Sequence, residues 1–190
     1  MPGDEAIIEG CVAGKRSAQS SLYRKYAAVM LAVCLRYAQN RDEAEDILQE
    51  AFLKIFQHIG TYRNEGSFEG WMKRIMINHA LNYFRKQRRA PFLEDIATIS
   101  ETEIVDNEEA PAFQSPVSAE TLISLIQTLP PGYRLVFNLY VFEDYSHREI
   151  SRELNISENT SKTQLLKARR MLRRKLEEMN LMKNTSTINE

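Results

Sequence analysis

The sequence predicts an all-α protein built from two small helical domains joined by an acidic linker. Apolar residues recur at three- and four-residue spacing through residues 5–90 and again through residues 117–180, which is the period of a helix packed on one face. No segment shows the alternation of apolar and polar residues that marks a half-buried strand. Between the two regions, residues 91–116 contain three prolines and no lysine or arginine, a composition typical of a linker.

Charge is strongly segregated along the chain, although the formal net charge of its 190 residues is only -1. Residues 61–90 hold seven basic and two acidic side chains, whereas residues 91–120 hold eight acidic and no basic ones. Local charged patches therefore decide which partners bind, and the overall pI near 6.4 is a poor guide to the charge of the partners.

Several features predict a cytoplasmic protein. Two cysteines give no disulfide framework and fit a reducing compartment. The first residues lack the basic and apolar regions of a signal peptide, and no apolar run approaches the ~20 residues that span a bilayer. The three histidines, His58, His79 and His147, are scattered without metal-ligand spacing. We expect no metal, no cofactor and no membrane segment of its own.

The sequence also predicts no catalytic residues. It contains no Gly-rich phosphate loop, no paired histidines with a helix carboxylate, and no cysteine and histidine at a spacing that would indicate a catalytic dyad. We therefore expect a protein that is not an enzyme.

Three main helices are predicted in the first domain, at about residues 17–39, 42–58 and 68–88. The second has acidic residues in its first turn, where the helix dipole favours anions. Its apolar stripe consists of Ala44, Ile47, Leu48, Ala51, Phe52, Ile55 and Ile59. This stripe turns Asp46, Gln49 and Glu50 towards another face, which is acidic and suits a basic partner surface. A solvated helix face is the plain alternative.

The loop and third helix mix aromatic and cationic side chains, which together bind single-stranded DNA. Phe68 and Trp71 are three residues apart, a spacing that favours packing in the core over stacking on bases. Asn78 and Asn82 lie one turn apart on the same face of this helix. Because Asn is a poor helix former, two of them at this spacing indicate a polar function and not a purely structural one.

In the second domain we predict a short helix over residues 117–128, a break at Pro130-Pro131-Gly132, and a helix over residues 133–142. A polar tail is predicted for residues 181–190. Between them, Ser146 and Glu149 form a capping box that starts a further helix.

Asn155 then supplies a left-handed turn, and Ser157 caps a second helix. Ile150 and Leu154 mark the buried face of the first helix, and Leu165, Leu166, Leu172 and Leu176 continue the stripe in the second. Residues 162–175 contain seven Lys or Arg and no acid. A short helix, a tight turn and a long basic helix predict a DNA-binding helix-turn-helix. An ordinary two-helix hairpin with a solvated basic face is the alternative.

Three stretches, in this order, resemble a bacterial sigma factor of the extracytoplasmic-function type (group 4 of the sigma-70 family). They are residues 41–56 (RDEAEDILQEAFLKIF), residues 66–86 (GSFEGWMKRIMINHALNYFRK), and residues 129–137 (LPPGYRLVF) leading into residues 145–150 (YSHREI). Such factors contain the second and fourth conserved domains of larger sigma factors. The resemblance implies a region 2 domain over residues 5–90 and a region 4 domain over residues 117–180.

The resemblance also implies residue roles. Asp46, Gln49 and Glu50 match the motif that grips a coiled coil of core RNA polymerase. The promoter-melting segment implies contacts to the minus-ten element and to a base flipped from the melted strand, by Arg63, Asn64, Gly66, Ser67, Lys73, Arg74, Asn78, Asn82, Arg85 and Lys86. For the flipped base, the loop residues Asn64, Gly66 and Ser67 and the helix residue Asn78 are the better candidates. Flipping a base out of the stack costs a few kcal/mol, and contacts in a close-fitting polar pocket must compensate for this cost.

The minus-thirty-five element is expected to be read by the start of the basic helix, because a recognition helix presents its first turns to the major groove. Candidate base contacts are Asn159, Ser161, Lys162 and Gln164, with Ser157 at the cap. Candidate phosphate contacts are Arg148, Arg152, Lys167, Arg169, Arg170 and Arg173. Many sequences of the family that this chain resembles have a small apolar residue where this one has Ser161.

The expected partners are core RNA polymerase, promoter DNA as duplex and as melted single strand, and an anti-sigma factor, often membrane-anchored in the family. The acidic linker would mimic RNA in the polymerase, or simply act as a soluble tether. Two other functions stay open at this point: a stand-alone helix-turn-helix transcription regulator and a helical protein-interaction module.

Overall fold

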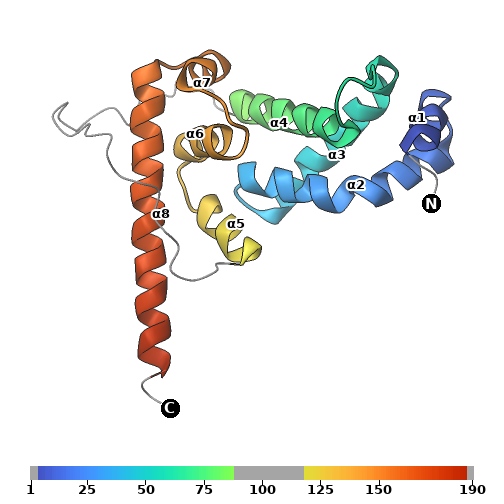
Figure 1. Cartoon of the computed structure of the whole chain (residues 1–190). Coiled ribbons are helices and arrows are strands. Elements are labelled where there is room, and N and C mark those ends of the chain that lie inside the picture. Colours follow the sequence, from blue (N-terminus) through green and yellow to red (C-terminus); the bar gives the residue numbers. More distant parts are fainter. Residues whose placement is uncertain (1–3, 88–117, 188–190) are drawn as a thin grey trace. The chain divides into compact units, whose positions relative to one another are not determined.

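The computed structural model describes residues 4–187 except 88–117. The described residues fold into helices without any strand, which confirms the all-α prediction. They form two compact units, one on each side of the gap (Figure 1). The predicted acidic linker, residues 91–116, lies outside the described residues.

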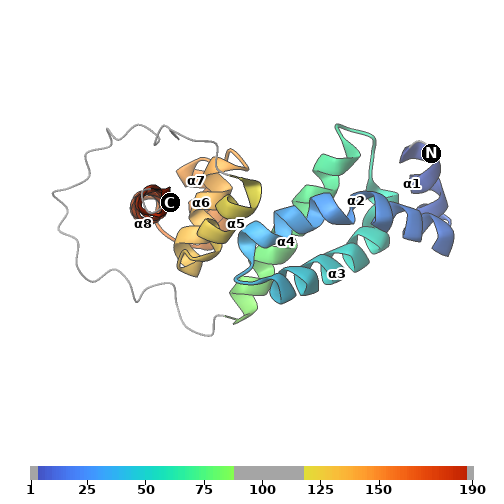
Figure 2. The ribbon, with the colours of Figure 1, turned by 90° about the horizontal axis from the view of Figure 1, so that it is seen from below.

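The first unit consists of α1 (Asp4–Val12), α2 (Arg16–Tyr37), α3 (Arg41–His58), a 3₁₀ turn (Ile59–Thr61) and α4 (Phe68–Gln87). Helices α2, α3 and α4 pack on one another, and α1 packs on α2 (Figure 2). Fully buried side chains fill the centre of these three helices, among them Leu22, Met30, Tyr37, Ile47, Phe52, Ile55, Met72, Met76 and Leu81.

Two features of this unit were not foreseen in the sequence. Helix α1 doubles back onto α2 at Gly10, where a Cβ atom would come within 2.6 Å of the Ala18 Cβ, so this close approach requires glycine. Val29 belongs to the apolar pattern of α2, yet it is 43% exposed. The buried stripe runs through its neighbour Met30, because the helix turns Val29 past the edge of the contact with α3 and α4.

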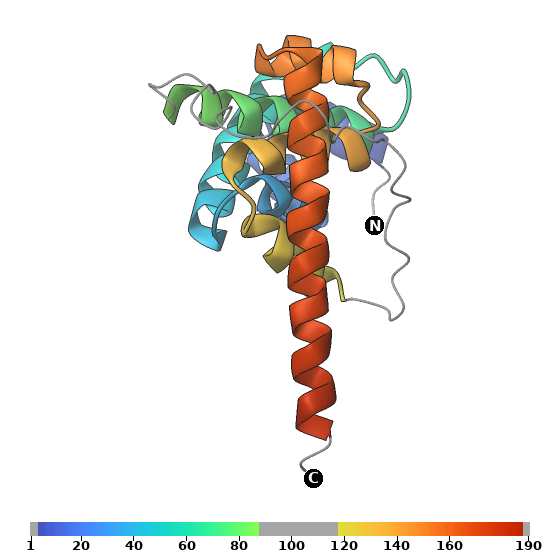
Figure 3. The same ribbon diagram turned by 90° about the vertical axis from the view of Figure 1, so that its left-hand side faces the viewer.

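The second unit consists of α5 (Ala119–Gln127), α6 (Pro131–Val141), α7 (His147–Leu154) and α8 (Glu158–Thr187). Helix α8 packs on the other three helices, which lie along one side of it when it is viewed end-on (Figure 2). The last turns of α8 project beyond α5, α6 and α7 (Figure 3).

Two boundaries in this unit differ from the predictions. Helix α6 begins at Pro131, inside the predicted break, because proline at the first helical position removes an N–H that would lack a partner anyway. The predicted polar tail is helical up to Thr187, because no proline or glycine interrupts α8 after Glu158.

The predicted caps of the helix-turn-helix are confirmed. Ser146 Oγ accepts a hydrogen bond from the Glu149 N–H at 3.3 Å, and the Glu149 carboxylate accepts from the Ser146 N–H at 2.9 Å. Asn155 ends α7 in the left-handed region with φ 53°. Ser157 Oγ accepts from the Thr160 N–H at 2.9 Å and so starts α8. These three hydrogen bonds and the left-handed Asn155 define where α7 begins, where it ends and where α8 begins.

Candidate protein and nucleic-acid interfaces

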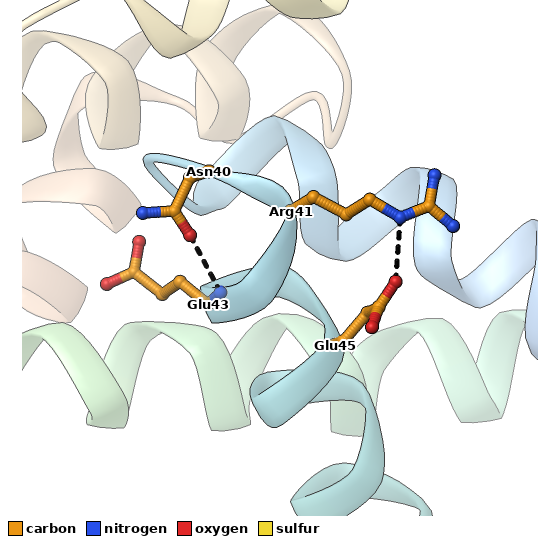
Figure 4. Close-up of polar contacts among 4 residues, drawn as sticks. All are labelled: Asn40, Arg41, Glu43 and Glu45. Carbon is orange, nitrogen blue, oxygen red and sulfur yellow. Dashed lines mark hydrogen bonds and ion pairs between the residues drawn. The ribbon is translucent and has the colours of Figure 1, made fainter.

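Helix α3 is fixed at its start by polar contacts (Figure 4). Asn40 Oδ1 accepts a hydrogen bond from the Glu43 N–H at 2.8 Å, and Arg41 Nε lies 2.7 Å from Glu45 Oε1. The Glu43 carboxylate in turn accepts from the Gln39 N–H. This cap fixes where α3 begins, and the apolar stripe of the helix packs on α2 and α4, which leaves Asp46 and Glu50 outside.

The side chains of Asp46, Gln49 and Glu50 are all exposed, and we call them the acidic face of α3. The structure therefore brings together the three residues that the sequence predicted. An apolar hollow of about 300 Å³ lies beside them between α2 and α3. It is lined by Tyr23, Ala27, Ala28, Leu31, Glu45, Leu48 and Gln49.

The sequence pattern did not indicate this hollow. Of the lining residues, Tyr23 is 38% exposed, and Leu53, one turn after Gln49 on α3, is 62% exposed. Apolar surface bordered by carboxylates and an amide is typical of a protein-binding surface.

The loop before α4 lies against an aromatic cluster. Tyr62 contacts Phe68 and Trp71, with ring centroids 5.1 and 5.6 Å apart, and the Phe68 and Trp71 rings stack at 5.6 Å. Phe68 is buried, which confirms that it belongs to the core, whereas Trp71 is only half-buried and keeps part of its ring at the surface.

Backbone contacts hold this loop in shape. The Tyr62 hydroxyl donates to the Gly66 carbonyl at 2.9 Å, and Asn64 and Gly66 both adopt positive φ. Ser67 Oγ accepts from the Gly70 N–H at 3.0 Å and so caps α4. The loop therefore presents the exposed Asn64 on a constrained backbone, while the Ser67 hydroxyl is already engaged.

The predicted residues of α4 lie at the surface. Asn78 and Asn82 are both exposed one turn apart, and Arg85 donates to Asn82 Oδ1 at 3.0 Å. Lys73 is half-exposed and lies 3.5 Å from Glu69. The other cations of the predicted set, Arg63, Arg74 and Lys86, are exposed.

In the helix-turn-helix, the predicted residues divide into open and buried positions. Ser161 is fully buried, and its Oγ lies 2.9 Å from His147 Nδ1 of α7. Gln164 is 9% exposed. Both face the helices packed on α8, which leaves them little or no surface for a base edge, and we remove them from the candidate base contacts. The exposed members are Arg148, Arg152, Ser157, Asn159, Lys162 and Arg170, and Lys167, Arg169 and Arg173 are half-exposed.

Aromatic side chains of α6 lie beside cations of α8, which the sequence did not indicate. The Lys167 Nζ lies 5.8 Å from the Tyr133 ring centroid, and the Arg169 guanidinium lies 5.6 Å from that of Tyr140. Tyr140 also stacks on His147 with centroids 4.8 Å apart. Such cation–π contacts restrict otherwise flexible side chains.

Comparisons with known proteins agree with this division into two units. Residues 22–90 match the family described as Sigma-70 region 2, and residues 119–172 match the one described as Sigma-70, region 4. Together the two matches span well over half of the chain. The RNA polymerase sigma-H factor of Pseudomonas aeruginosa is 28% identical over 182 residues, which cover 92% of this chain and 94% of the relative. The chain belongs to the sigma-70 family, as a sigma factor of the extracytoplasmic-function type.

The sigma-factor resemblance seen in the sequence is thus confirmed. The ECF RNA polymerase sigma factor SigM of Bacillus subtilis is 27% identical over 154 residues, which cover 80% of this chain and 91% of the relative. Among solved structures, the sigma factor RpoE of Bartonella quintana, in complex with the anti-sigma factor NepR, aligns at 17% identity with a TM-score of 0.49. That alignment covers 83% of this chain and 96% of that chain.

As a class, sigma factors are regulators of transcription initiation and not enzymes. In this sigma factor, no group of histidine, cysteine or acidic side chains within the described ranges could hold a metal ion. None of the helices described here combines the length and the apolar character that a membrane span needs.

Proposed function

We propose that this sigma factor binds core RNA polymerase through the acidic face of α3 and directs initiation at promoters through α4 and α8. The observation that carries the proposal is the order of the two sigma-70 regions, with a carboxylate-bearing helix in the first and a cationic helix-turn-helix in the second. Region 2 is assigned to residues 5–90 and region 4 to residues 117–180.

Charge and exposure support the polymerase contact. Asp46 and Glu50 are exposed and project from a helix whose opposite side is fully packed. A basic partner surface would be attracted to them, and the apolar hollow beside Gln49 would add buried area. The same surface would be available to an anti-sigma factor, which is the proposed antagonist.

The loop before α4 and the exposed side of α4 are proposed to read the minus-ten element in its melted form. Asn64 lies exposed in a loop that the bond from the Tyr62 hydroxyl to the Gly66 carbonyl constrains, and the Tyr62 ring belongs to the aromatic cluster with Phe68 and Trp71. The Asn64 amide can hydrogen-bond the edge of an unpaired base, and cations of α4 can hold the adjacent phosphates. Asn78 is proposed as the second base contact.

Helix α8 is proposed to read the minus-thirty-five element in the major groove. Asn159 and Lys162 are the exposed polar side chains of its first turns, and they are the proposed base contacts after removal of Ser161 and Gln164. Arg148 and Arg152 of α7 are proposed to contact phosphates. Ser157, Lys167, Arg169, Arg170 and Arg173 of the cap and of α8 complete the proposed phosphate contacts.

The proposal includes no chemistry by the chain itself, because the polymerase forms the phosphodiester bonds. It places the protein in the cytoplasm, where the polymerase and the chromosome lie. The acidic residues 91–116 are proposed to connect the two regions on the polymerase.

Reconstituted transcription tests the proposal. Purified full-length chain is added to bacterial core RNA polymerase on a library of promoter fragments, and transcript start sites are sequenced. We expect selective initiation that requires both the chain and the core enzyme. Tight promoter binding by the chain alone, as a dimer and without effect on core polymerase, would instead identify a stand-alone regulator.

A further inference from the structure

A buried histidine lies directly behind the acidic face of α3. His79 of α4 is 7% exposed, although its neighbour Asn78 is exposed. Its Nε2 lies 3.0 Å from Oε2 of Glu50, whose side chain is 60% exposed. The contact therefore joins the core of the first unit to a carboxylate proposed to bind polymerase.

The chemistry of this pair determines the tautomer of the ring. A carboxylate only accepts hydrogen bonds, so a hydrogen bond between this pair requires the hydrogen on Nε2 and, in the neutral ring, the lone pair on Nδ1. Neither ring nitrogen has a well-aligned hydrogen-bond partner within the described parts of the chain. Because Glu50 is exposed and rotatable, its carboxylate is the group that can turn into line with Nε2–H.

The ring is neutral when it makes this contact at pH 7. Burial lowers the pKa of His79, and the positive charge of Lys54 on α3 lowers it further, as does Lys86 on α4, while Glu50 acts in the opposite direction. A neutral donor orients a carboxylate without cancelling its charge. A lysine or arginine at this position would pair with Glu50 and neutralise it.

We propose that His79 is a positioning residue for polymerase binding, which holds the Glu50 carboxylate in the orientation that a basic partner surface meets. This inference rests on the proposed function, because it takes Glu50 to be a polymerase contact. An unrestrained glutamate loses rotamer freedom when a partner binds, and a contact with Nε2–H that restricts the carboxylate beforehand reduces that cost. Helix α4 therefore supports the polymerase surface of α3 in addition to its proposed DNA contacts.

A double-mutant cycle on the full chain tests this role, with affinity for core RNA polymerase as the readout. The variants are His79→Leu, which removes the donor, His79→Gln, which keeps an N–H, Glu50→Gln, and the double variant of His79→Leu with Glu50→Gln. We expect His79→Leu to weaken binding by roughly three- to ten-fold, and His79→Gln to restore most of the loss. In the Glu50→Gln background the amide can still accept from Nε2–H, but the charge that the basic partner surface meets is gone, so His79→Leu should change little. Glu9→Gln on α1, an exposed carboxylate outside the proposed surface, is the control.

The outcomes separate this inference from the proposed function. Failure of the wild-type chain to bind core polymerase would overturn both. Normal binding with an effect of Glu50→Gln but none of His79→Leu would overturn the role of His79 alone. An equal loss from His79→Leu in both backgrounds would show a merely structural effect, and would also overturn it.

A measurement on the wild-type chain does not depend on how the variants fold. Nitrogen-15 NMR of the imidazole identifies the protonated ring nitrogen at pH 7. We expect the hydrogen on Nε2, with a chemical shift of Nε2 that changes in Glu50→Gln. A hydrogen on Nδ1 would contradict the proposed donor.

Discussion

Helices α3 and α8 begin with the same device and expose opposite charges. Asn40 accepts from the Glu43 N–H at 2.8 Å at the start of α3, and Ser157 accepts from the Thr160 N–H at 2.9 Å at the start of α8. The open side of α3 then presents carboxylates, and that of α8 presents cations. The cap and the apolar stripe build the helix, and the remaining positions select a basic protein or a nucleic acid as partner.

The two helices also differ in how much of their surface is left open. Helix α3 packs on α2 and α4 through a single stripe, so its acidic face stays exposed as a block. Helix α8 packs on both α6 and α7, and the contact with α7 includes its first turns. Its open positions are therefore interrupted by buried ones such as Ser161, and fewer side chains can reach DNA.

Reversing the charge of α3 should give the largest effect. We expect Asp46→Lys combined with Glu50→Lys to reduce affinity for core polymerase by about a hundred-fold or more, because like charges would face the basic partner surface at a cost of several kcal/mol. Binding is measured by fluorescence anisotropy with labelled full-length chain. Glu5→Lys combined with Glu9→Lys, on α1, is the control and should bind normally. Equal losses in both pairs would indicate a general effect of net charge and not a defined surface.

At α8 the expected effect is on sequence preference. Asn159→Ala or Lys162→Ala should lower the preference of the holoenzyme for its minus-thirty-five sequence by roughly ten-fold, the usual value of one good base contact. Ser161→Ala should leave that preference unchanged and destabilise the second unit by about 1 kcal/mol, because it removes the hydrogen bond with His147. Competition binding with scrambled elements measures the first effect, and urea denaturation measures the second. A loss of preference in Ser161→Ala without loss of stability would return Ser161 to the base contacts.

The same contrast explains what could be predicted from the sequence. Capping residues such as Ser146 with Glu149 and Ser157 act locally, so the starts of α7 and α8 followed directly from residue spacing. The acidic face of α3 was also predictable, because one stripe defines both the buried and the open side. Ser161 was predicted to contact bases because the helical period of the apolar residues does not show that α7 covers the first turns of α8. His79 carried no sequence signal, since its role depends on a carboxylate in another helix.

Phosphate contacts should weaken binding without altering preference. We expect Arg170→Ala to reduce holoenzyme affinity for all promoters by a similar factor, and to lower the slope of log K against log salt concentration by about one. Arg174→Ala is the matched control, because Arg174 lies 3.7 Å from Glu178 further along α8 and beyond the region 4 match. A salt slope unchanged in Arg170→Ala would show that this side chain does not reach a phosphate.

The smallest effect should come from the capping box that starts α7. Ser146→Ala should lower the free energy of unfolding of the second unit by about 1 kcal/mol, as is typical of a lost N-cap. The Ser146 hydroxyl and N–H lower the pKa of Glu149 in the folded chain. Because the unfolded pKa is higher, the stability linked to Glu149 is present above the ordinary glutamate range and is lost as pH falls through the lowered value.

Denaturant titrations of both proteins between pH 3 and pH 7 test this linkage, with the pH range chosen to bracket the ordinary glutamate pKa of ~4.3. The stability difference between wild type and Ser146→Ala should be largest at neutral pH and should shrink at the acid end. In the helix-turn-helix the cap also sets the approach of α7 to α8, so Ser146→Ala should weaken promoter binding in parallel. A constant stability difference across the pH range would mean that the Ser146 hydroxyl acts through its bond to the Glu149 N–H alone.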